Sequence, residues 1–134
     1  MICAGFHRSL DALGKIFEFT RAFYDDQRIG DADRLVVDFC VEEIFTNFVK
    51  YNRGNPHEIE LSLERHGNRL VAHLTDFDVE PFDVTRAPAV DVTQPAERRE
   101  PGGLGLHLIR RLADRVDYDY TDRRSRITVT KSLG

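Results

Sequence analysis

The segment from Asp31 to Tyr51 most constrains how this chain folds, because it has the pattern of a helix that is apolar almost all round. Its apolar positions are Leu35, Val36, Val37, Phe39, Cys40, Val41, Ile44, Phe45, Phe48 and Val49. A helix with apolar side chains on every side must be buried on several sides. We therefore expect it to pack between a sheet and a first helix, and to be capped by Asp31 or Asp33.

The flanking segments show the periodicities of helices and strands. Apolar residues recur every three or four positions after Ser9, a suitable N-cap, and this pattern ends just before Gly30. The other expected elements are an edge strand at 2–7, a hairpin of strands at 59–63 and 70–74, a helix at Leu104–Asp114, and strands at 116–120 and 127–129. This order predicts one α/β domain over residues 1–134, an α+β two-layer sandwich with three helices on one face of an antiparallel or mixed sheet.

Residues 77–103 interrupt these patterns. Four of the five prolines lie in this segment, which holds few apolar residues: Pro81, Pro88, Pro95 and Pro101. Irregular segments of about 25 residues are uncommon in compact domains and usually serve a function. We expect a lid or loop here.

Composition narrows the class of protein. Hydrophobic residues make up 41% and charged residues 31%, as in an ordered globular chain, and the net charge of −4 argues against general nucleic-acid binding. No apolar run approaches the roughly 18 residues of a membrane span, and residues 1–10 lack a signal-peptide pattern. Cys3 and Cys40 have no redox or metal-ligand spacing. We expect a cytoplasmic protein that binds neither nucleic acid nor membrane.

Polar residues inside the apolar helix are the first sign of chemistry. A spacing of four places Glu43, Asn47 and Tyr51 on one helix face. A carboxylate and an amide are costly to bury without partners. They serve either a ligand or each other and nearby backbone groups, and the spacing alone leaves both readings open.

Two further segments carry acids and glycines at the ends of predicted elements. Asp76 and Asp78 follow the strand at 70–74, and the glycines of 102–105 open the third helix. Backbone N–H groups at a glycine-rich helix N-terminus can approach an anion closely. The glycine cluster is neither a P-loop nor a dinucleotide fingerprint, since it lacks Gly-Lys-Ser/Thr and follows no strand.

In this order the three features resemble the anti-sigma factor serine/threonine-protein kinase family, a branch of the ATPase superfamily shared with gyrase, heat-shock chaperones and sensor histidine kinases. The resemblance runs from the first helix to Lys131. Its motifs here are Glu43-xxx-Asn47-xxx-Tyr51, Pro81-Phe82-Asp83, the run from Gly102 to Asp114, and Ile127-Thr-Val-Thr-Lys131. The family's fold is the Bergerat-type ATP-binding fold, which agrees with the predicted sandwich.

The resemblance implies ATP and Mg²⁺ as cofactors and a role for each matched residue. Asn47 would hold Mg²⁺ against the phosphates, and Glu43 would be the general base. Asp76 would accept a hydrogen bond from the adenine amino group, with Asp78 as its rival. The remaining matched residues would contact phosphates or lie near the adenine: Gly102, Gly103, Leu104, Gly105 and Thr128.

One departure from the family pattern bears on function. The family has a glycine two positions after the strand-end acid, where this chain has Asp78, and the spacing to Pro81-Phe82 is one residue longer. A side chain there would stand where backbone should approach the base. Nucleotide affinity or base preference is therefore expected to differ.

Two functions follow from the resemblance. The first is an ATP-dependent protein-serine kinase of a partner-switching circuit, which phosphorylates a small antagonist protein and sequesters a sigma factor or other target. The alternative is a catalytically weak or nucleotide-free module that only sequesters its partner. A sensor histidine kinase is disfavoured, because no helix with an acceptor histidine precedes the domain. A homodimer is a further expectation of the resemblance.

Overall fold

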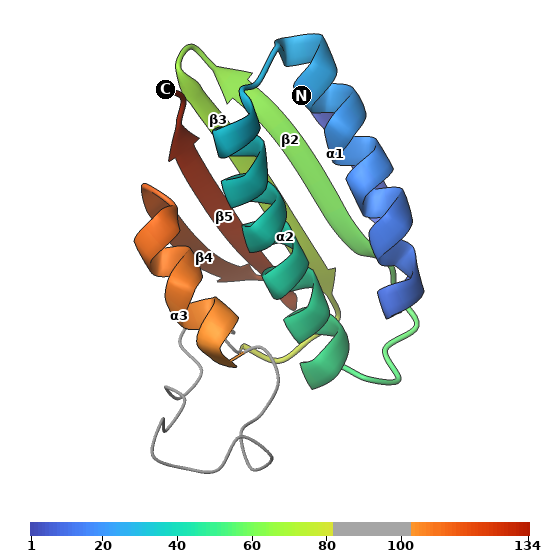
Figure 1. Ribbon diagram of the computed structural model, residues 1–134. Coiled ribbons are helices and arrows are strands. Elements are labelled where there is room, and N and C mark those ends of the chain that lie inside the picture. The colour runs from blue at the N-terminus through green and yellow to red at the C-terminus, as the bar shows by residue number, and fades with distance from the viewer. Residues whose placement is uncertain (82–102) are drawn as a thin grey trace.

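The computed structural model describes residues 1–81 and 103–134, and of residues 103–106 the backbone alone. Its elements are β1 (Ile2–Phe6), a 3₁₀ turn η1 (Leu10–Ala12), α1 (Leu13–Gln27), α2 (Asp31–Tyr51), β2 (Ile59–His66), β3 (Arg69–Phe77), α3 (Gly103–Leu112), β4 (Arg115–Thr121) and β5 (Arg124–Ser132). The strands form one sheet in the order β1-β2-β3-β5-β4, with every neighbouring pair antiparallel. All three α-helices cover one face of this sheet (Figure 1), which confirms the predicted two-layer α+β sandwich.

The central helix α2 is apolar all round because it has neighbours on three sides. It contacts α1 on one side, α3 on the other, and β3 and β5 beneath. The expectation that it lies between the sheet and the first helix is therefore corrected: the three helices share one layer, and α2 is in its middle (Figure 1). Its side chains join those of β2, β3 and β5 in a single core.

The helix boundaries follow local capping rules, with two corrections. Ser9, expected to cap the first helix, is the N-cap of the 3₁₀ turn η1, and its hydroxyl accepts a hydrogen bond from the N–H of Asp11. The N-cap of α1 itself is Ala12, which makes no side-chain cap hydrogen bond. Arg28, the C-cap of α1, is in the left-handed conformation with φ 56°. Gly30, and neither Asp31 nor Asp33, is the N-cap of α2. The two carboxylates lie in the first turn, where the helix dipole favours negative charge.

The segment expected as a lid is partly ordered by strand pairing. Phe77 still pairs with Arg124, and the N–H of Val79 donates to the carbonyl of Arg123 at 3.0 Å. The first residues of the expected 77–103 segment therefore continue the pairing at the ends of the inner strands β3 and β5. Residues 82–102, which include Gly102 and most of the expected lid, lie outside the described part of the chain.

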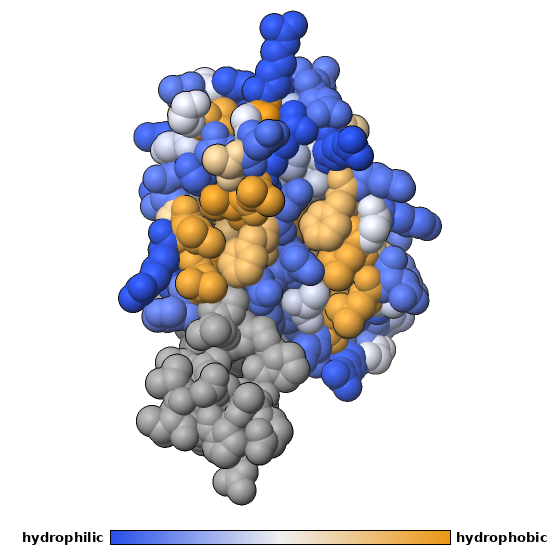
Figure 2. All heavy atoms as spheres, in the orientation of Figure 1, coloured by the Kyte–Doolittle hydropathy of each residue, from blue (hydrophilic) through white to orange (hydrophobic). Residues whose placement is uncertain are grey.

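The helix face carries two apolar areas separated by polar side chains (Figure 2). Large exposed hydrophobic residues on the helices include Leu35 of α2 and Leu108 and Leu112 of α3. In the ranges that the structure describes, no helix is long and apolar enough to span a membrane.

Candidate functional site

Glu43 and Asn47 lie one helical turn apart in α2. The Asn47 amide Nδ2 donates to the carbonyl oxygen of Glu43 at 2.6 Å, so the helix itself provides an acceptor for this amide group. Asn47 is only 2% exposed. The interpretation that these side chains bond to nearby backbone groups is therefore correct for Nδ2 of Asn47.

The oxygens of the same two residues have no such partner. Asn47 Oδ1 and Glu43 Oε2 are buried and lack a hydrogen-bond partner in the described structure. Buried polar atoms without partners are rare and call for a bound group or water. Burial, together with the nearby charge of Glu42, raises the pKa of Glu43 above its usual value. Glu43 is thereby a stronger proton acceptor than an exposed glutamate.

A hollow of about 440 Å³ opens beside these residues. Besides Glu43 and Asn47, the described residues that line it are Leu10, Thr46, Val49, Lys50 and Arg53. Its walls combine apolar surface with a carboxylate, an amide and two basic side chains. Such a mixture suits a small molecule that has both a charged and an apolar part.

The N-terminus of α3 lies beside the C-terminal half of α2 (Figure 1). Gly103, Leu104 and Gly105 form the first turn of α3, so the glycine-rich segment opens a helix as the sequence predicted. The first N–H groups of a helix have no intrahelical acceptor and favour an anion. The N-terminus of α3 therefore lies beside the half of α2 that carries Glu43 and Asn47.

Asp76 lies at the end of β3 and is fully buried. Its carboxylate forms an ion pair with Arg8 and accepts from Asn52 Nδ2 at 2.7 Å and from the N–H of Phe77 at 3.1 Å. Asn52 is the C-cap of α2, so Asp76 is fixed to the end of the helix that carries Asn47. The sequence did not indicate the partner Arg8.

Asp78, the rival of Asp76, has an exposed side chain. Its Oδ1 lies 2.8 Å from Arg123 Nε, and this guanidinium lowers the pKa of Asp78. The backbone of Asp78 has φ 55°, in the left-handed region that glycine adopts without strain. Residue 78 thus has a backbone conformation that glycine favours, and its carboxylate pairs with Arg123.

Thr128 is not brought to this region. Its hydroxyl lies 2.8 Å from His73 Nδ1, and it alternates along β5 with the core residues Ile127 and Val129. It therefore lies on the sheet face that carries no helices, and the structure does not bring it together with Glu43, Asn47 and Asp76.

Ser125 is the residue of β5 that the sequence reasoning missed. It pairs in register with Asp76 on the helix-facing side, is 2% exposed, and its hydroxyl lacks a partner in the described structure. The period of two along β5 was the available signal. Because Ile127 faces the core, Ser125 must face it too, and Thr128 must not.

Comparison with known proteins identifies the family. Residues 6–131 match the family described as the histidine kinase-like ATPase domain, so the chain belongs to this family. It is 26% identical over 99 residues to the serine/threonine-protein kinase BtrW of Bordetella bronchiseptica, covering 72% of this chain and 69% of that protein. It is 30% identical over 98 residues to the sensor histidine kinase YxdK of Bacillus subtilis, covering 70% of this chain but 30% of that kinase.

Solved structures agree on the fold. The RsbU and RsbW domains of Rv1364c from Mycobacterium tuberculosis superpose with a TM-score of 0.71 at 12% identity, over 98% of this chain and 32% of that one. The histidine kinase AdeS of Acinetobacter baumannii gives 0.55 at 14% identity, over 100% of this chain and 68% of that one. The chain thus spans about a third of the first of these.

The family implies ATP as a ligand, with Mg²⁺ as its usual companion. The partnerless oxygens of Asn47 and Glu43 fit this expectation, because Mg²⁺ prefers oxygen ligands and keeps several waters that need acceptors. Among the described residues, no group of three or more His, Cys, Asp or Glu side chains forms a protein-only metal site. A magnesium ion here would depend on phosphate oxygens as well.

Proposed function

We propose that this protein is an ATP-dependent protein-serine kinase that acts as an anti-sigma or partner-switching regulator. It phosphorylates a small antagonist protein and, in the alternative state, holds a sigma factor or another target. The observation that carries the proposal is the pair of buried, partnerless oxygens on Glu43 and Asn47 beside the N-terminus of α3. The similarity to BtrW, which is named a serine/threonine-protein kinase, favours serine or threonine as the acceptor.

The proposed roles follow from the chemistry of these residues. Asn47 would hold Mg²⁺ through Oδ1, and the ion would neutralise the charge of the triphosphate. The N–H groups at Gly103 to Gly105 would bind phosphate oxygens, helped by the dipole of α3. Glu43, with its raised pKa, would accept the proton of the attacking serine hydroxyl. Phosphoryl transfer requires mainly positioning and charge neutralisation, so few residues suffice.

The apolar areas of the helix face support a protein partner. Leu35 of α2 is 73% exposed, and two apolar areas lie on the helix face (Figure 2). Large exposed apolar patches commonly mark sites where another protein binds. We propose that this cytoplasmic regulator meets its protein partners through helices. A second copy of the chain is one candidate partner.

Two measurements test the proposal. Calorimetric titration with a non-hydrolysable ATP analogue should show binding that depends on Mg²⁺. Incubation with γ-labelled ATP and candidate antagonist proteins should then give acid-stable phosphoserine. Acid-labile label would indicate a histidine kinase instead, and a folded protein that binds no nucleotide would remove the kinase proposal.

One observation favours a second function, a nucleotide-free module that only sequesters its partner. The carboxylate of Asp76, expected to accept a hydrogen bond from adenine, is already bonded to Arg8, Asn52 and the Phe77 N–H. A protein that no longer uses ATP could keep such a saturated carboxylate. Absence of nucleotide binding together with tight partner binding would establish this function.

A further inference from the structure

Arg8, in the segment between β1 and η1, has every guanidinium N–H in use. An arginine side chain has five N–H donors. Here they meet five acceptors: the carbonyl oxygens of Phe48, Asn55 and His57 and both carboxylate oxygens of Asp76. The guanidinium lies 3.2 Å from the oxygen of Asn55 and 3.3 Å from those of Phe48 and His57. Arg8 thus joins the end of α2, the following loop and the end of β3.

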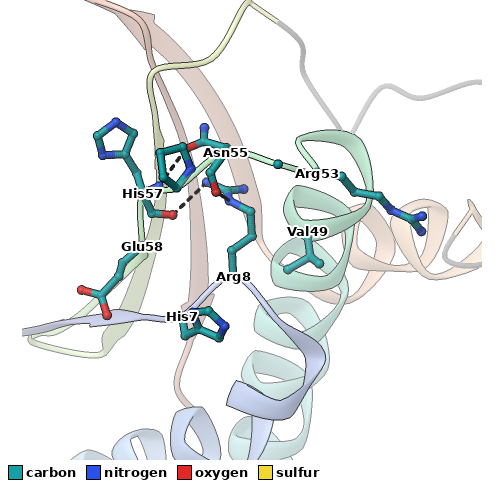
Figure 3. Close-up of a pocket in the computed structure, with 9 residues that line it drawn as sticks. His7, Arg8, Val49, Arg53, Asn55, His57 and Glu58 are labelled. Carbon is teal, nitrogen blue, oxygen red and sulfur yellow. Dashed lines mark hydrogen bonds between the residues drawn. The ribbon is translucent and has the colours of Figure 1, made fainter.

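Arg8 borders a second, smaller hollow. Figure 3 shows the side chain reaching from the segment after His7 to Asn55 and His57, beside a hollow of about 220 Å³. This hollow shares Val49 and Arg53 with the larger hollow beside Asn47. The Arg8 side chain is nevertheless only 6% exposed. Its guanidinium is therefore part of the protein interior at the edge of the candidate site.

Groups of the protein itself occupy both oxygens of the Asp76 carboxylate. Oδ1 accepts from Arg8 and the Phe77 N–H, and Oδ2 accepts from Arg8 and Asn52. A carboxylate offers about four lone-pair sites. With four donors bound and none of its surface exposed, Asp76 has no site left for a ligand.

We propose that Arg8 makes Asp76 a structural anion that is unavailable to a nucleotide base, and that Arg8 is thereby a positioning residue that removes selection for a 6-amino purine. The proposal rests on the proposed nucleotide-binding function. Among the described residues, the hydroxyl of Ser125, opposite Asp76 in register, is a buried polar group without a partner that could then meet the base. A hydroxyl rotates to donate or accept, so it serves a 6-amino and a 6-oxo purine equally.

The first test compares two nucleotides that differ at the 6-position of the base. The unmodified protein is titrated with the non-hydrolysable analogues of ATP and of inosine triphosphate, both with Mg²⁺. The dissociation constants are expected to agree within about threefold, since neither base gains a charged hydrogen bond. Such a bond would favour ATP by roughly tenfold or more. A preference above tenfold would overturn the proposal.

The second test removes the guanidinium. Arg8→Met keeps most of the side-chain volume and frees Asp76, so a preference for the ATP analogue of about tenfold should appear. Arg65→Met is the matched control, because Arg65 also bonds two backbone carbonyls but lies in the β2–β3 hairpin. Unchanged selectivity in the control supports the proposal, whereas unchanged selectivity in folded Arg8→Met contradicts it.

A third measurement is independent of nucleotide and applies even if Arg8→Met is too unstable to titrate. The fall in melting temperature caused by Arg8→Met is measured in the unmodified chain and in an Asp76→Asn background. The fall should be at least halved in the second case, because the charge that Arg8 compensates is gone. Equal falls would overturn the proposal. A halved fall in a protein that binds neither nucleotide would support the structural role of Asp76 while removing the kinase function.

Discussion

Replacing Asn47 with alanine tests whether this residue serves ligand binding or the stability of the fold. The substitution loses the hydrogen bond from Nδ2 to the Glu43 carbonyl, about 0.5–1.5 kcal/mol, and the packing of a small buried side chain, roughly 1–2 kcal/mol. It also removes the buried, partnerless Oδ1, which relieves about 1–3 kcal/mol, and improves helix propensity by roughly 0.5 kcal/mol. These contributions oppose one another, and we expect the free energy of unfolding to change by no more than about 1 kcal/mol.

The effect on ligand binding should be much larger. If Asn47 Oδ1 holds Mg²⁺, Asn47→Ala should abolish the gain in nucleotide affinity that Mg²⁺ gives the unmodified protein. Urea unfolding and calorimetric titration with and without Mg²⁺ measure the two effects on the same preparation.

Asn52→Ala is the matched control, since it makes the same substitution five residues later in the chain. The Asn52 amide donates to the buried carboxylate of Asp76, and a bond to a charged group contributes about 1.5–3 kcal/mol. This variant should lose stability and keep the effect of Mg²⁺. The reasoning is refuted if Asn47→Ala loses more than about 2.5 kcal/mol while the effect of Mg²⁺ on affinity persists.

Three further predictions test the site and the fold. Glu43→Gln should bind nucleotide but slow transfer by on the order of 10²–10⁴. Burial raises the pKa of Glu43 above 4.5, and in the unmodified protein the rate should fall as pH drops through this pKa, because a protonated carboxyl accepts no proton. The fall in rate at low pH should be absent in Glu43→Gln. If it persists there, another group causes it. Asp78→Gly should change affinity for an ATP analogue by less than about threefold, since its carboxylate is exposed and paired with Arg123; a tenfold gain in titration would show that the side chain obstructs the site. A thiol reagent should label exposed Cys3 in the folded protein and Cys40 only after denaturation, because Cys40 is buried and its pKa is raised to about 12; two labels without denaturant would contradict the core packing.

The architecture could be predicted because the pattern of each element agrees with its place. The period of two in β2 and β3 matches a sheet with one covered face, and the all-round apolar pattern of α2 matches a helix with three neighbours. The pattern predicted that α2 is buried on several sides but did not predict that α3 covers one of them. The position of α3 beside α2 depends on contacts between residues far apart in sequence, which periodicity does not report.

The site was predictable where its residues share one helix. Glu43 and Asn47 are neighbours because of the helical repeat, so spacing alone placed them together. Arg8 was not predictable, since 68 residues separate it from Asp76 and no local rule links a segment after β1 to the end of β3. Thr128 lies away from Asp76 for a different reason: the period of two along β5, which Ile127 and Val129 display, puts it on the opposite face of the sheet.

The left-handed backbone of Asp78 and the buried ion pair between Asp76 and Arg8 are structurally linked. Asp78 holds a left-handed backbone that costs a non-glycine residue about 1–2 kcal/mol, yet Asn55 Nδ2 donates to the carbonyl of Phe77 at 2.8 Å and Arg123 pairs with its carboxylate. The carbonyl of the same Asn55 accepts from Arg8. The loop that supports residue 78 is therefore held by the arginine that saturates Asp76. Restoring glycine at 78 leaves this arginine in place, so we expect selection for adenine to return when Arg8 is changed, whether residue 78 is aspartate or glycine.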